Sequence, residues 1–118
     1  MGTFREFELE AIRLMADTVL SSVHLDALAA IPAPESYEYT GCGYFLTVSH
    51  TSLPEVTRTL HKPAVVGRSG EVQAGFVVFL RPKYLTLECH TWGAVDVPSD
   101  FRDRMVEISA SPQLQERE

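Results

Sequence analysis

The sequence predicts an α+β domain in which one long N-terminal helix packs on an antiparallel sheet of four to five strands. Apolar residues recur with helical spacing over residues 3–30, whereas the chain after Pro34 is rich in β-branched and aromatic segments. Short connections between those segments favour antiparallel neighbours. A length of 118 residues suits one domain with a single core.

The first element is a helix over residues 3–30. Thr3 and Glu6 have the spacing of a capping box, in which each side chain accepts a hydrogen bond from a free amide at the helix start. Pro32 and Pro34 end the helix, because proline cannot donate a backbone hydrogen bond and disfavours a helical predecessor. The apolar stripe that should face the sheet contains Ile12, Ala16, Val19 and Val23.

A second group of apolar residues flanks the charged side of this helix and contains Phe7, Leu14, Leu25 and Leu28. Two interpretations are open. The sheet or the C-terminal segment curls around the helix and covers these residues, or they form an interface with another protein or a second copy.

Five segments with strand composition and alternation follow the prolines. Residues 50–61 contain Pro54 and polar side chains, which predicts a loop or a short helical turn. Residues 112–118 are polar and are expected to be flexible. The five predicted strands are residues 42–49, 63–67, 71–81, 84–92 and 104–109.

Composition excludes several classes of protein. The formal net charge of −6 disfavours general binding to phosphate backbones. We expect neither a nucleic-acid nor a membrane partner, since the chain also lacks an apolar run long enough to span a bilayer. Its start lacks the apolar core of a signal peptide, and two cysteines do not make a disulfide framework. These features predict a soluble, reduced, cytoplasmic protein.

Candidate binding residues lie on one face of the predicted strand 84–92. Glu88 and His90 are two positions apart, so their side chains should lie about 7 Å apart on one surface. Such a group can bind a polar ligand or perform acid–base chemistry, although a solvated outer face gives the same pattern. The candidate binding residues are Tyr84, Glu88, His90 and Trp92, with Asp96 and Asp100 in the adjoining loop.

The cysteines and histidines do not predict a catalytic or metal site. Cys89 and His90 are adjacent, so in a strand they face opposite ways and cannot form a dyad. We expect Cys89 and Cys42 to be buried among apolar residues. No cofactor motif is present, and the residues that could bind a metal lack paired ligand spacing; they are His50, His61, His90, Cys42 and Cys89.

Three blocks of sequence resemble a pattern found in small bacterial proteins of unassigned function. Residues 40–45 read T-G-C-G-Y-F, residues 75–79 read G-F-V-V-F, and residues 85–88 read L-T-L-E. They are similar to T-G-x-G-[FY]-F, G-F-x-x-F and L-x-x-L-E, the last one residue shorter here. Some proteins with this pattern look like immunity proteins that neutralise a toxin. The resemblance covers roughly residues 40–98 and implies no catalytic residue.

The leading hypothesis is therefore a small non-enzymatic protein-binding module, and the resemblance implies a toxin-neutralising immunity protein. The acidic balance suits a basic partner such as a nuclease toxin. One alternative is a ligand-binding domain or enzyme whose pocket beside the sheet uses Tyr44, Glu88 and His90. A further alternative is a homodimeric scaffold protein that associates through the open sheet face or the extra apolar side of the helix.

Overall fold

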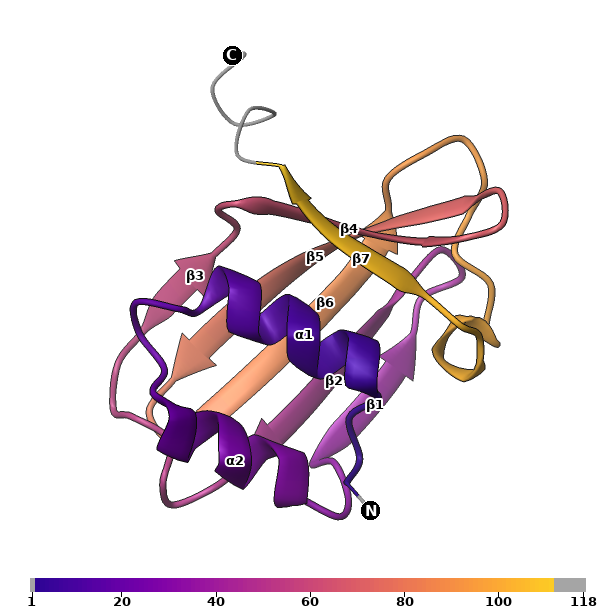
Figure 1. Ribbon diagram of the computed structural model, residues 1–118. Helices are drawn as coiled ribbons and strands as arrows, with labels where there is room; N and C mark the ends of the chain where they lie inside the picture. Colours follow the sequence, from indigo (N-terminus) through magenta and orange to yellow (C-terminus); the bar gives the residue numbers. More distant parts are fainter. Residues whose placement is uncertain (1, 112–118) are drawn as a thin grey trace.

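The computed structural model describes residues 2–111, which form two helices followed by one antiparallel sheet (Figure 1). The helices are α1 (Glu6–Met15) and α2 (Ser22–Ala30). A short 3₁₀ turn, η1 (Phe101–Asp103), precedes the last strand. The strands are β1 (Ser36–Tyr39), β2 (Tyr44–Ser49), β3 (Arg58–Leu60), β4 (Ala64–Ser69), β5 (Val72–Arg81), β6 (Tyr84–Thr91) and β7 (Glu107–Ser111).

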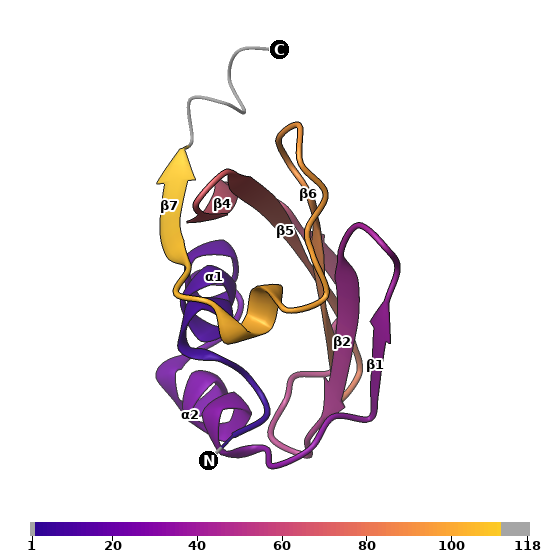
Figure 2. The same ribbon diagram turned by 90° about the vertical axis from the view of Figure 1, so that its right-hand side faces the viewer.

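The sheet has the strand order β1-β2-β6-β5-β4-β7, and β3 pairs with β5 outside this path. β5 reaches both partners because it is ten residues long: its first half pairs with β4 and its second half with β3. Figure 2 shows that the sheet curls, so that β4 and β7 bend over α1 while both helices stay on one side. The sheet therefore has a concave face that holds the helices and a convex face that they leave uncovered.

The core fills the space between α1 and the concave face. Ala11 and Ile12 of α1 are fully buried. They pack in one hydrophobic cluster with rows of residues that pair across the strands. One such row is Leu46, Leu87 and Val78, and the next is Val48, Leu85 and Leu80. The predicted alternation in β2, β5 and β6 is confirmed, since these residues are buried and their neighbours along each strand are more exposed.

The prediction of a single helix over residues 3–30 is wrong, because the chain turns after Met15 and starts a second helix at Ser22. A straight helix of that length would measure about 42 Å, longer than the 38 Å of the molecule's longest dimension. Two shorter helices fit on the concave face instead. The start is also displaced: the amide of Arg5 donates to Glu8 at 2.7 Å, so Arg5 and Glu8 take the place expected for Thr3 and Glu6.

Within the second apolar group, Phe7 is covered both by the C-terminal segment and by the sheet. Its ring contacts Phe101 of η1, with centroids 5.6 Å apart, and Phe76 of β5, with centroids 6.2 Å apart. Leu28 is fully buried as well. Leu14 and Leu25 remain partly buried against the core.

Several strand boundaries differ from the prediction. β1 was not expected, and β3 lies inside residues 50–61, which were expected to be a loop. Both are short and mostly exposed, so neither carries an apolar alternation that a sequence pattern could detect. β7 begins at Glu107 and not at residue 104, because residues 104–106 form the connection that leads from η1 into the strand. The expected flexible end, residues 112–118, lies outside the described residues.

Cys42 is exposed, contrary to the prediction that it is buried, whereas Cys89 is buried as expected. β2 begins at Tyr44, so Cys42 lies in the turn that joins β1 to β2. Gly41 permits this turn, since its φ of 97° is a conformation that side chains other than glycine rarely adopt. The turn moves Cys42 off the buried face that Tyr44, Leu46 and Val48 share.

A buried carboxylate, Glu8, connects both ends of the described chain to the sheet. Arg102 donates to its two oxygens, from Nε at 2.7 Å and from Nη2 at 2.9 Å. The hydroxyl of Tyr44 donates to the same carboxylate. Arg102 also donates to the carbonyl oxygen of Thr3 at 2.6 Å. Glu8 is the one fully buried charged side chain among residues 2–111, and this network supplies the partners that a buried charge needs.

Arg102→Ala should lower the free energy of unfolding by about 3–5 kcal/mol, because it leaves the Glu8 carboxylate buried without its counter-ion. Urea denaturation followed by circular dichroism measures this change. Arg104→Ala is the matched control. Arg104 pairs with Asp100 at 3.2 Å on the surface, and such pairs contribute about 1 kcal/mol or less. Equal losses in both variants would contradict the role assigned to Glu8.

Stability should also fall at alkaline pH because of Tyr44. Burial and the Glu8 carboxylate raise the pKa of the Tyr44 hydroxyl well above its ordinary value. Above pH ~10 the unfolded chain releases this proton while the folded chain keeps it, which costs about 1.4 kcal/mol of stability per pH unit. Burial raises the pKa of the Cys89 thiol in the same direction.

Above pH ~10, the unfolding free energy of the wild type should fall with pH more steeply than that of Tyr44→Phe. The difference in slope should be about 1.4 kcal/mol per pH unit, the value for one proton. Urea titrations at several alkaline pH values measure the slope. Burial keeps the pKa of the Cys89 thiol raised in both proteins, and loss of the Tyr44 hydrogen bond, which lowers it, would raise it further. The decrease in slope therefore reports the Tyr44 proton. An unchanged slope in Tyr44→Phe would refute this assignment.

Candidate functional site

The convex face of the sheet collects the predicted site residues of β6. Leu85, Leu87 and Cys89 point into the core, so the side chains between them point outward. Neither helix lies on this side (Figure 2). The structure thus brings Tyr84, Glu88 and His90 onto one open surface, with Trp92 directly beyond the end of the strand.

One row of this face joins three residues on adjacent strands at the β1 edge of the sheet. Phe45 of β2 pairs with Glu38 of β1 on one side and with Glu88 of β6 on the other. Paired side chains of this kind lie about 5 Å apart at Cβ. Phe45 is 37% exposed. Within residues 2–111, neither Glu38 nor Glu88 forms an ion pair with a lysine or arginine; the one charge partner of Glu88 is His90, at 4.0 Å.

His90 and Trp92 pack over Gly75, which lies opposite His90 on β5. Their ring centroids are 6.3 Å apart. A Cβ atom at Gly75 would lie 2.6 Å from His90 Nε2 and 2.7 Å from Trp92 Cε3, so the absence of a side chain makes room for both rings. Nδ1 of His90 is buried and makes no hydrogen bond within the described residues; it lies 4.0 Å from Glu88 Oε2.

The other end of the face is more basic and contains Tyr84. The Arg81 guanidinium lies 5.2 Å from the centre of the Tyr84 ring, a cation–π contact. A shallow depression of about 340 Å³ adjoins them, lined in part by Phe45, Phe79 and Thr86. The convex face therefore has a carboxylate-rich part and an arginine-containing part, with aromatic rings in both.

Asp96 and Asp100 lie apart from this row. Asp96 accepts a hydrogen bond from Thr91 at 3.4 Å, and Thr91 points away from the convex face because it alternates with His90. Asp100 pairs with Arg104 at 3.2 Å. These contacts hold both aspartates in the loop around η1.

Sequence reasoning missed Phe45 and Glu38. Phe45 lies on the polar side of the predicted strand 42–49, and its position between two inward-facing residues could have identified it. Glu38 gave no such signal, since the strand that positions it was not predicted. Tyr44 faces the core, so it does not line a common pocket with Glu88 and His90.

The described residues offer chemistry suited to binding. Between Gly2 and Ser111, no three histidine, cysteine, aspartate or glutamate residues gather closely enough to hold a metal ion. The convex face instead presents rings that can stack and carboxylates that can pair with cations. No described helix combines the length and apolar character needed to cross a membrane.

The fold and this face define an α+β protein with an open, aromatic and acidic sheet surface. Comparison with protein-family models, curated proteins and solved structures finds no match to the chain.

Gly75→Ala should displace the rings of His90 and Trp92 and cost about 1–3 kcal/mol of stability, because the added methyl group overpacks the site. Trp92 is the single tryptophan, so its fluorescence reports the movement directly, and we expect emission at longer wavelength. Gly93→Ala is the control, since its Cβ would meet the Gln73 side chain at an ordinary 3.4 Å. Identical spectra for the wild type and Gly75→Ala would contradict this packing.

Proposed function

We propose that this protein is a small protein-binding module whose convex sheet face binds a basic protein. The observation that carries the proposal is the exposed ring of Phe45 between Glu38 and Glu88. A lysine or arginine of a partner can stack on this ring and pair with both carboxylates. Neither carboxylate has a lysine or arginine partner within residues 2–111, and the one charge partner of Glu88 is His90 at 4.0 Å.

Two further features support a protein partner. Trp92 and Tyr84 are 44% and 39% exposed on or beside the same face, and these residue types dominate the binding energy of protein interfaces. The net charge of −6 would accelerate association with a basic partner.

The biological role we propose is neutralisation of a toxin, as the resemblance of residues 40–98 implies. A basic nuclease is the class of toxin whose charge fits this face. We propose a cytoplasmic location for the complex. Both cysteines are free, which is typical of proteins in a reducing compartment.

Self-association through the same row is less favourable. A symmetric dimer brings the same patch of both copies together. Glu38 and Glu88 of one copy would then approach those of the other, and facing like charges cost several kcal/mol. A basic partner avoids this repulsion.

The proposal is tested in two steps. Light scattering after size-exclusion chromatography should give a monomer for the wild type. Immobilised wild type should then recover from source-cell lysate a basic protein that, once purified, binds it with an affinity that falls as salt rises. Phe45→Ala should weaken this binding about 30-fold, the effect expected of a central anchor.

Val23→Ser is the matched control, because Val23 is an exposed apolar residue of α2, outside the convex face. It should bind the purified partner as the wild type does. A wild-type dimer that Phe45→Ala dissociates would overturn the proposal, as would an acidic binder or a binder insensitive to Phe45→Ala.

A further inference from the structure

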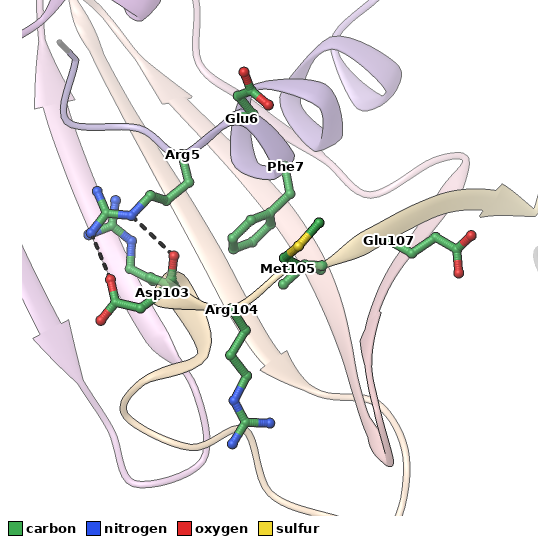
Figure 3. A pocket seen from close by; sticks show the side chains of 9 residues that line it. Arg5, Glu6, Phe7, Asp103, Arg104, Met105 and Glu107 are labelled. Atoms are coloured by element: carbon green, nitrogen blue, oxygen red, sulfur yellow. Dashed lines mark hydrogen bonds and ion pairs between the residues drawn. The ribbon is translucent and has the colours of Figure 1, made fainter.

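A larger groove lies on the other side of the molecule, between the start of α1 and the segment that leads into β7. Its volume is about 900 Å³. Phe7 is buried at its base, and Met105 is 94% exposed. Figure 3 shows the side chains of Phe7 and Met105 close together, with the arginine cluster on one side and Glu107 on the other. An almost fully exposed methionine beside a buried ring is a typical adaptable contact for an apolar side chain of another protein.

Each arginine of this groove already has a carboxylate partner. Arg5 pairs with Asp103 at 3.2 Å (Figure 3). Arg102 pairs with the buried Glu8 at 2.7 Å, and Arg104 pairs with Asp100 at 3.2 Å. The arginines therefore do not make the groove a site for anions.

Two carboxylates at the groove remain without an ion pair among residues 2–111: Glu6 and Glu107 line it but belong to no salt bridge. Glu107 lies opposite Arg68 in the sheet, so Glu6 is the more independent charge. Three arginines and three carboxylates line the groove. The carboxylate left without an ion pair or a facing arginine is Glu6, which can pair with one cationic group of a ligand.

Glu6 also borders a second, smaller groove of about 390 Å³ between the two helices. This groove has Leu9 and Leu25 on its floor and Glu10 beside Glu6, one helical turn farther along α1. Arg13 is its single basic lining residue. The two grooves thus share Glu6, and together they present apolar side chains and carboxylates along α1.

We infer that this surface of α1 binds a basic amphipathic segment of a partner protein. An apolar side chain of the segment packs against Phe7 and Met105, and a neighbouring lysine or arginine pairs with Glu6. The sequence of residues 112–118, Pro-Gln-Leu-Gln-Glu-Arg-Glu, does not have the chemistry of such a segment, because two glutamates and one arginine give it a net negative charge. This site is separate from the convex face and does not depend on the function proposed for that face.

The test uses the full chain and a labelled synthetic peptide of leucine and lysine at helical spacing, measured by fluorescence anisotropy. Two further peptides replace every lysine with glutamate or every leucine with serine. We expect binding of the first peptide alone. Glu6→Gln and Met105→Ser should each weaken it about fivefold or more, the effect of losing one anchoring contact. Both residues are exposed, so these variants should fold.

Controls distinguish this site from general attraction to an acidic protein. Glu71→Gln removes an exposed carboxylate in the turn between β4 and β5 and should not change the affinity. In amide NMR spectra, the peptide should shift signals of residues 5–10 and 102–107.

Three results would overturn the inference. One is no measurable binding of the leucine–lysine peptide. Another is equal weakening by Glu6→Gln and Glu71→Gln, which would indicate non-specific charge attraction. The third is NMR shifts confined to the convex face, which would leave the function proposed for that face intact while refuting the groove.

Discussion

The structure depends on the environment of one carboxylate, that of Glu8. A charge with no solvent contact is tolerated only when hydrogen bonds and a counter-ion surround it. Here the Arg102 guanidinium, the Tyr44 hydroxyl and the Arg5 amide provide them. The requirement fixes where α1 begins and holds η1 against the start of β2. It also orients the segment that carries Met105, and so shapes the groove beside it.

The sequence predicted the structure correctly where an alternating apolar pattern corresponds to burial on one face of the sheet. Alternation along residues 84–92 separated Leu87 from Glu88 correctly, because burial on one side of a sheet imposes a period of two. The sequence did not predict features that lack a local signal or that depend on contacts between residues far apart in the chain. The helix break after Met15 falls in a segment without proline or glycine. Glu8 looked like an ordinary surface charge because its partner Arg102 lies 94 positions away.

The curl of the sheet gives the molecule two dissimilar surfaces. On the concave side, β4 and β7 bend around α1 and leave a groove at its first turn (Figure 2). On the convex side, the open strands align Glu38, Phe45 and Glu88 in one row. Both surfaces combine carboxylates with exposed aromatic or sulfur-containing side chains. Since they lie on opposite sides of the core, two ligands could occupy them without steric competition.

The distance in sequence between Glu8 and Arg102 has a consequence for synthesis in the cell. After Glu8 is added to the nascent chain, its carboxylate has no counter-ion until 94 more residues have been translated. β7, which covers one side of the same helix, is made later still. At ordinary elongation rates this interval lasts about 5–20 s. The nascent chain must keep an acidic helix unburied throughout, so this domain should complete folding only after release of its C-terminal strand from the exit tunnel.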